Sequence, residues 1–184
     1  FLFLERKGVK SIGIFLVRQT PKGPEVLIRY QPLCIDNSDP LPLFQCPVTG
    51  GIEEGEEPVV CAVREAEEEA GYRLNKNELH LIIEYIVGTQ TNETVYLYYA
   101  DVTGREADEP SGDGSYHESL SYNAWEPLTN LRAYPYSACQ IASPVLEQVM
   151  FRPATNIFDA MFQYPLGVRR GDGIAPAGKL PFLA

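Results

Sequence analysis

The sequence predicts one α/β domain, because stretches typical of strands and stretches with helical spacing alternate along its first 151 residues. Four stretches rich in Val, Ile, Leu, Phe and Tyr have the composition and length of β-strands. They are Val9 to Arg18, Glu25 to Tyr30, Leu79 to Val87 and Thr94 to Val102. Pro58 to Ala70 and Ser137 to Met150 are predicted helices. The 184 residues fit one domain at 1–151 and a C-terminal extension at 152–184.

Breaker residues separate these elements. The segment from Thr20 to Pro24 predicts a turn, and the proline-rich residues 31–43 predict a loop that ends at a short apolar run around Phe44. Residues 103–117 predict a long polar loop before a final strand at Ser121 to Trp125.

Two predictions concern the C-terminal part of the chain. Pro144 should begin or bend the closing helix, because proline removes a helical hydrogen bond. The extension 152–184 is expected to be extended or packed on the domain or a partner, because its second half is rich in glycine and proline.

The first predicted helix has clear boundary signals. Pro58 stands at its first turn, acidic residues precede it, and Gly71 is placed to end it. Five apolar residues with helical spacing would form a narrow stripe for packing on the sheet. They are Val59, Ala62, Val63, Ala66 and Ala70.

Composition excludes several classes of protein. Apolar residues make up 45% of the chain and charged residues 22%, which argues against disorder. Asp and Glu outnumber Lys and Arg by 25 to 15, giving a net charge of -10, so long nucleic acid is not an expected partner. The four cysteines form no CxxC pair, so we expect a reducing cytoplasm. The apolar stretches are shorter than the ~20 residues of a membrane span, so no membrane association is expected.

Three glutamates on the first helix are the leading candidates for chemistry. Glu65, Glu68 and Glu69 are related as i, i+3 and i+4, so their carboxylates should share one side of the helix, opposite the apolar stripe. Their repulsion is unfavourable unless positive charge offsets it, and Mg²⁺ prefers such oxygen ligands. The alternative is a solvated acidic face with no ligand.

The residues around these glutamates extend the pattern. Gly50 is followed six positions later by Glu56 and then by Arg64, which is positioned to pair with Glu56 and fix the loop against the helix. The segment from Gly50 to Tyr72 matches the Nudix signature, Gly-x5-Glu-x7-Arg-Glu-U-x-Glu-Glu-x-Gly-U with U an apolar residue, at each specified position.

The resemblance to the Nudix hydrolase family implies an α/β/α sandwich with a mixed sheet and a loop-helix-loop site for Mg²⁺ or Mn²⁺. Carried over by position, it implies that Glu65 and Glu69 are the principal metal ligands, with Glu68 a further or second-shell ligand and the Thr49 carbonyl a backbone ligand. It implies structural roles for a second group of residues in the box, Gly50, Glu56, Arg64 and Gly71. The implied activity is hydrolysis of a phosphoanhydride bond in a nucleotide-type substrate.

The reaction also needs a base that takes a proton from water. Glu118 is the first candidate, because the segment from Tyr116 to Trp125 is similar to the Glu-His...Tyr-x-Trp segment of members that act on nucleoside triphosphates. Glu68 is a second candidate for a catalytic role. The alternative for Glu118 is an exposed loop carboxylate, and other acids could serve as the base. They are Glu93, Glu106 and Glu109.

The substrate prediction comes from two short segments. Phe44 to Gly50 and Thr91 to Thr94 are similar to segments of Nudix dihydroneopterin-triphosphate and dATP pyrophosphohydrolases. They favour a nucleoside-triphosphate-like substrate, with Arg29 and Glu93 as contacts, although Arg29 could instead be a surface residue paired with an acid. The alternatives are an ADP-ribose or nucleotide-sugar pyrophosphatase and a catalytically silent nucleotide-binding regulatory module. A homodimer is expected by default, because many relatives are dimers.

Overall fold

The computed structural model describes residues 9–33, 42–112 and 119–151, and a mixed β-sheet forms the centre of this part of the chain. The strands are β1 (Lys10–Thr20), β2 (Gly23–Pro32), β3 (Leu43–Cys46), β4 (Val48–Gly51), β5 (His80–Ile86), β6 (Thr94–Asp101) and β7 (Tyr122–Pro127). Their order is β3-β2-β1-β6-β5, with β4 paired to β1 and β7 paired to β2. β1 and β6 are parallel, and the other pairs are antiparallel.

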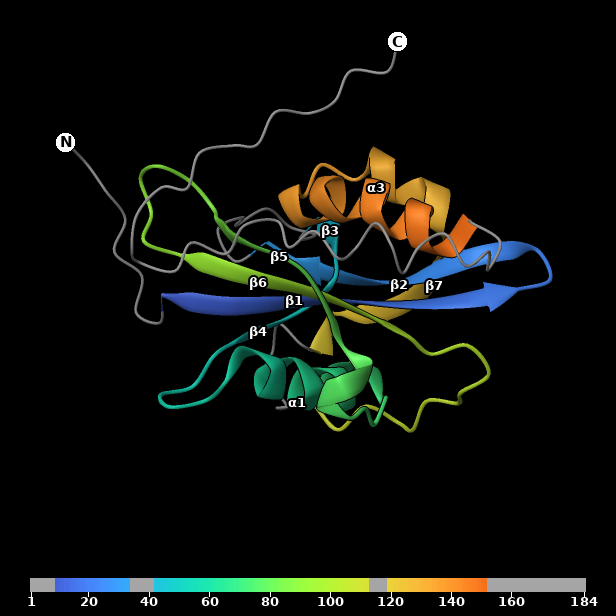
Figure 1. Cartoon of the computed structure of the whole chain (residues 1–184), viewed down its shortest axis with the longest axis horizontal. Coiled ribbons are helices and arrows are strands. Elements are labelled where there is room, and N and C mark those ends of the chain that lie inside the picture. The colour runs from blue at the N-terminus through green and yellow to red at the C-terminus, as the bar shows by residue number, and fades with distance from the viewer. Residues whose placement is uncertain (1–8, 34–41, 113–118, 152–184) are drawn as a thin grey trace, which may run out of the picture. The chain divides into compact units, whose positions relative to one another are not determined.

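Two helices cover opposite faces of this sheet (Figure 1). They are α1 (Pro58–Ala70) and α3 (Ser137–Phe151). Two short 3-10 helices, Lys76–Glu78 and Leu128–Ala133, connect neighbouring elements. The mixed sheet between helices confirms the α/β sandwich that the sequence predicts.

β1 and β2 pair with each other over only part of their lengths, and their separation determines where Gly50 and Gly51 lie. The second half of β1 pairs with β2, while its first half, from Ser11 to Ile14, pairs with β4. β2 pairs instead with β3 from Arg29 onward. β3 and β4 therefore lie where β1 and β2 diverge, and β4 delivers Gly50 and Gly51 from the middle of the sheet to the start of α1.

The core on the α1 face combines long strand side chains with small helix side chains. Ile12, Ile14 and Leu16 of β1 are at most 1% exposed and pack towards Ala62 and Ala66, which are fully buried. Alanines bring the axis of a helix close to the surface on which it packs, because they have only a Cβ atom. The short side chains thus hold α1 close to the sheet.

The core on the α3 face consists of larger apolar side chains. Phe15 and Val17 of β1 alternate with the residues that face α1, as expected for a strand that is buried on both sides. Leu146 of α3 is fully buried against them, together with Leu128 and Leu131 of the second 3-10 helix.

The predicted elements differ from the observed ones in specific places. β4 was not predicted, because a strand of four residues that ends in Gly-Gly has no clear apolar periodicity. β2 begins at Gly23, so the turn before it is shorter than predicted. α3 does not begin at Pro144 but passes through it, with seven helical residues before the proline. The extension 152–184 lies outside the described residues.

Candidate active site

Glu56 ties the loop after β4 to α1. The backbone N–H of Glu53 donates to Glu56 Oε2 (3.0 Å), and Nε of Arg64 donates to Glu56 Oε1 (3.2 Å). The hydrogen bond from Arg64 is the main reason why the pKa of Glu56 lies below its ordinary value. The Glu56 side chain therefore fixes the loop to α1, because it binds both the loop backbone and Arg64 of the helix.

Arg64 also faces two of the predicted metal ligands. Its Nη1 donates to Glu65 Oε1 (2.7 Å) and to Glu68 Oε2 (3.0 Å). These bonds and the bond to Glu56 raise the pKa of Arg64. In this structure the guanidinium of Arg64 supplies positive charge to two of the three carboxylates.

Glu65 is buried, although it is a carboxylate. Its exposed fraction is 8%, and its side chain lies directly over Gly50 on β4. A Cβ atom at Gly50 would lie 2.1 Å from Glu65 Oε1, so the carboxylate occupies space that only glycine leaves open. Burial raises the pKa of Glu65, because the charged form loses more hydration than the guanidinium of Arg64 restores.

The prediction that the three carboxylates lie opposite the apolar stripe is wrong for Glu65. It shares the buried side of α1 with Ala62 and Ala66. Helical spacing places Glu65 beside the stripe, and the gap over Gly50 then lets it turn towards the sheet. Glu65 therefore does not belong to a solvated acidic face.

Glu69 lies one helical turn beyond Glu65 and contacts the neighbouring strands. Arg29 Nη2 is 3.2 Å from Glu69 Oε1, and the two side chains are only 6% and 19% exposed. Nδ2 of Asn123 donates to the backbone carbonyl of Glu69 (2.6 Å). Arg29 on β2 and Asn123 on β7 are direct register partners, so two adjacent strands contact one glutamate.

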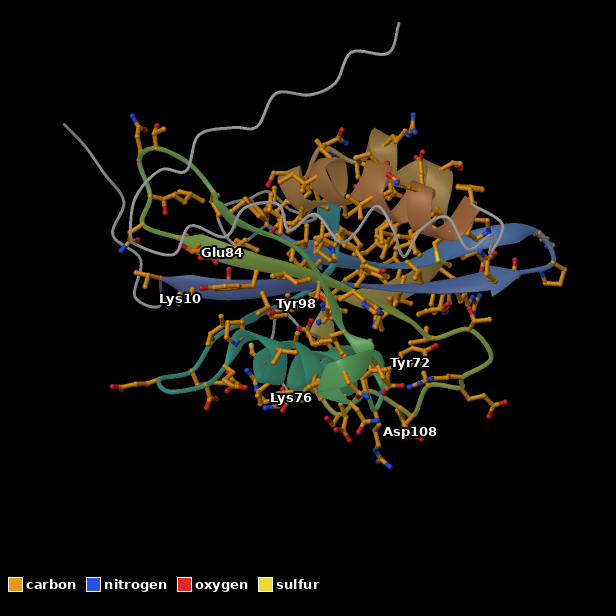
Figure 2. All side chains as sticks on the ribbon, viewed as in Figure 1. Lys10, Tyr72, Lys76, Glu84, Tyr98 and Asp108 are labelled. Atoms are coloured by element: carbon orange, nitrogen blue, oxygen red, sulfur yellow. The ribbon has the colours of Figure 1, made fainter. Side chains whose placement is uncertain are left out.

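The end of α1 is closed by the loop that follows β6. Gly71 has a φ of 73°, the left-handed conformation that ends many helices, and a Cβ there would lie 2.0 Å from the carbonyl oxygen of Asp108. The Asp108 N–H donates to Gly71 O (2.9 Å), and the Gly112 N–H donates to Glu68 O (3.1 Å). Figure 2 shows Asp108 and Tyr72 at this end of α1. The close contact between the end of α1 and the Asp108 backbone is therefore possible only with glycine at position 71.

Not every predicted site residue lies near these carboxylates. Thr49 does, because it precedes Gly50 on β4. Glu93 accepts a hydrogen bond from Ser11 Oγ (2.8 Å). The pKa of Tyr85 and of Tyr136, two residues of the α3 face, is raised mainly by burial and to a smaller extent by the negative charge of Glu93. The structure thus places Glu93 on the face of the sheet opposite to Glu65. Glu118 lies outside the described residues.

The oxygen donors of these carboxylates suit a hard divalent cation, but in this structure the side chains are not gathered around one point. Glu65, Glu68 and Glu69 offer only oxygen donors, which are the donors that Mg²⁺ and Mn²⁺ prefer. Within residues 9–33, 42–112 and 119–151, however, no three Asp, Glu, His or Cys side chains lie close enough together to hold a metal ion. Instead, Arg64 faces Glu65 and Glu68, and Arg29 faces Glu69.

Sequence reasoning missed Asn123 and Gln31. Gln31 Oε1 accepts a hydrogen bond from Arg29 Nε (3.3 Å), and Asn123 binds the Glu69 carbonyl. One signal was present, because strand alternation puts Arg29 and Gln31 on the same face as Leu27, which packs towards α1. No local pattern shows that Asn123 lies beside Arg29, because that neighbour relation depends on the register of β7.

Comparison with known proteins places this site in a family. A family model for the NUDIX domain matches residues 7–148, which is most of the chain. A search of curated protein sequences found no significant match. Among the described residues, no helix has the length and apolar character needed to cross a membrane. The chain belongs to the Nudix family and is a hydrolase that acts on pyrophosphate bonds of nucleoside diphosphate derivatives.

Proposed function

We propose that this enzyme is a metal-dependent pyrophosphohydrolase whose substrate is a nucleoside-triphosphate-like compound. Water would attack phosphorus and break a phosphoanhydride bond, so that the products are the monophosphate and pyrophosphate. Nudix enzymes generally need divalent metal ions such as Mg²⁺. A bound divalent cation neutralises phosphate oxygens and lowers the pKa of water. The observation that carries the proposal is the burial of Glu65 beside Glu68 and Glu69 on one helix.

The ligand roles are assigned by position in the box. Glu65 and Glu69 would be the principal ligands of Mg²⁺ or Mn²⁺, Glu68 a further one, and the Thr49 carbonyl a backbone ligand. The contacts of Glu56, Arg64 and Gly50 support this assignment, because Glu65 packs against Gly50 of β4 and Arg64 links Glu65 and Glu68 to Glu56 of the loop.

Glu118 is the proposed general base. The described residues that flank its segment, Gly112 and Asn123, both bind backbone carbonyls of α1, those of Glu68 and Glu69. The role of Glu118 itself rests on the similarity of the segment from Tyr116 to Trp125 to members that act on nucleoside triphosphates. Glu118→Gln should reduce kcat by about 10²- to 10⁴-fold, the usual contribution of a general base, and should remove the acidic limb of the pH profile. An unchanged profile would move the role to Glu106 or Glu109, since Glu93 lies on the opposite face of the sheet.

A substrate panel tests the proposed function. The enzyme is assayed for formation of the nucleoside monophosphate, the product common to nucleoside triphosphates, ADP-ribose and nucleotide sugars, with Mg²⁺, with Mn²⁺ and with EDTA. We expect turnover that EDTA abolishes and that Glu69→Gln reduces to background. Glu67→Gln is the matched control, because Glu67 is on the same helix but its side chain is 50% exposed.

The panel also separates the alternatives. Preference for ADP-ribose or a nucleotide sugar would replace the triphosphate proposal, since the similarity to dihydroneopterin-triphosphate and dATP pyrophosphohydrolases is confined to short segments. Folded protein without turnover in either metal would favour a catalytically silent regulatory module. The homodimer, the cytoplasmic location, and the phosphate contact of Arg29 and substrate contact of Glu93 stay predictions.

A further inference from the structure

Arg29, in the middle of β2, is a buried arginine. Arg29 is 5% exposed, although arginine is almost never fully buried unless it is paired. Its Nη2 lies 3.2 Å from Glu69 Oε1, and its Nε donates to Gln31 Oε1. Arginine stays protonated in proteins, so it cannot relieve its burial by losing its charge. Arg29 therefore needs Glu69, the carboxylate with which it forms an ion pair.

The same pair affects Glu69. Helix α1 places Glu65 and Glu68 within one turn of Glu69, so Glu69 lies in a field of negative charge. Arg64 contacts Glu65 and Glu68, and Arg29 of β2 contacts Glu69. Asn123 meanwhile holds the Glu69 backbone by its carbonyl. β2 thus fixes the Glu69 carboxylate through the charge of Arg29, and β7 fixes the Glu69 backbone through Asn123.

We propose that Arg29 is a positioning residue that acts as a built-in counter-ion for Glu69, orienting this carboxylate before metal binds and weakening the metal affinity of the site. The inference rests on the proposed function, because it takes Glu69 as a ligand. When a cation binds at Glu69, the nearby guanidinium repels it, so the apo protein gains stability at the expense of metal affinity. In the metal-free enzyme Arg29 then offsets the charge of Glu69, as Arg64 offsets those of Glu65 and Glu68.

The proposal predicts opposite changes in two measurements on Arg29→Met. In EDTA, the variant should unfold at a lower temperature than wild type, because the half-buried Glu69 loses the guanidinium with which it forms an ion pair. Titration with Mn²⁺, followed by electron paramagnetic resonance of the free ion, should show binding that is tighter by on the order of ten-fold, because a repulsive charge has been removed. A purely structural role would lower stability without tightening Mn²⁺ binding, and a role in phosphate contact alone would raise KM only.

Three further variants make the test sharp. Arg29→Lys keeps the charge and should bind Mn²⁺ with nearly wild-type affinity. Arg18→Met is the matched control for Mn²⁺ binding, because Arg18 pairs with Glu25 (2.7 Å) and lies over the Trp125 ring; it should leave the Mn²⁺ affinity unchanged. The double variant of Arg29→Met with Glu69→Gln buries neither charge, so it should be more stable in EDTA than Arg29→Met alone. That comparison applies even if Arg29→Met does not fold.

The outcomes separate the inference from the proposed function. If wild type binds Mn²⁺ and Glu69→Gln weakens that binding, but Arg29→Met leaves it unchanged or weaker, the counter-ion role is overturned and the metal site stands. A double variant no more stable than Arg29→Met would overturn it equally. If wild-type Mn²⁺ binding is absent or does not depend on Glu69, the proposed metal site fails, and the inference fails with it.

Discussion

The two faces of the sheet bury different kinds of side chain. On the α3 face, large apolar residues such as Phe15, Leu97 and Leu146 are fully buried against one another. On the α1 face, the helix contributes mainly small residues, and here lie both charged side chains that are buried in the described part of the chain, Arg29 and Glu65.

The difference shows how one domain separates stability from chemistry. Apolar burial stabilises by roughly 25 cal/mol per Å² and needs no partner of defined geometry. Buried charges contribute little net stability, because desolvation offsets much of their attraction. We therefore expect substitutions on the α3 face to affect mainly unfolding and substitutions around Glu65 to affect mainly hydrolysis.

Leu146→Ala should have the largest effect on stability. Leu146 is fully buried in the α3 cluster, and truncation to Ala at such positions costs about 2–5 kcal/mol of unfolding free energy. Denaturant unfolding measures this loss, and kcat of the folded fraction should not change. Gln148→Ala is the control, because Gln148 is exposed on the same helix. A fall in kcat greater than the fall in folded fraction would mean that the two faces are coupled.

Gly50→Ala should slow hydrolysis without removing any of the carboxylates. The new Cβ would lie 2.1 Å from Glu65 Oε1, so the carboxylate must move. A displacement of about 1 Å at a reacting centre can cost roughly 100-fold in rate, and we expect a kcat loss of this order. Gly51→Ala provides the comparison, since its Cβ meets no atom within 4 Å. Equal losses in the two variants would contradict the close contact between Gly50 and Glu65.

Glu65→Gln should change stability less than Leu146→Ala does, and it should raise stability instead of lowering it. Burial raises the pKa of Glu65, so its ionised form lowers the stability of the folded protein above that raised pKa. In EDTA at pH 7, the variant should be at least as stable as wild type, although its hydrolysis is lost. The difference should shrink as pH falls through the raised pKa towards the ordinary value of 4.5, because wild-type Glu65 becomes protonated.

Thermal unfolding between pH 4 and pH 8 measures this difference. Glu67→Gln controls for the loss of one negative charge on α1, because Glu67 is exposed. A Glu65→Gln protein that is less stable at pH 7, with a deficit that grows as pH rises, would show that Arg64 stabilises the carboxylate more than burial destabilises it.

Local features of the sequence predicted the helix that carries the site. α1 runs from Pro58 to Ala70 as predicted, because proline favours the first turn of a helix and Gly71 adopts the left-handed conformation that ends it. β4 was not predicted, whereas α3 contains Pro144 within the predicted range of Ser137 to Met150. β4 depends on packing, since a four-residue strand forms only with a partner such as β1, and the large apolar side chains of α3 hold that helix against the sheet.

The sequence alone determined the family and the spacing of the carboxylates, because both follow from short-range order along one segment. Only the tertiary structure decided which cation faces which carboxylate. Arg64 contacts Glu65 and Glu68 because all three residues are neighbours on α1, and Glu56 of the preceding loop holds Arg64 in place. Arg29 contacts Glu69 only because the fold brings β2 against the part of α1 that carries Glu69. Contacts of the second kind depend on strand register and helix docking, and these arise when distant segments bury their apolar faces together.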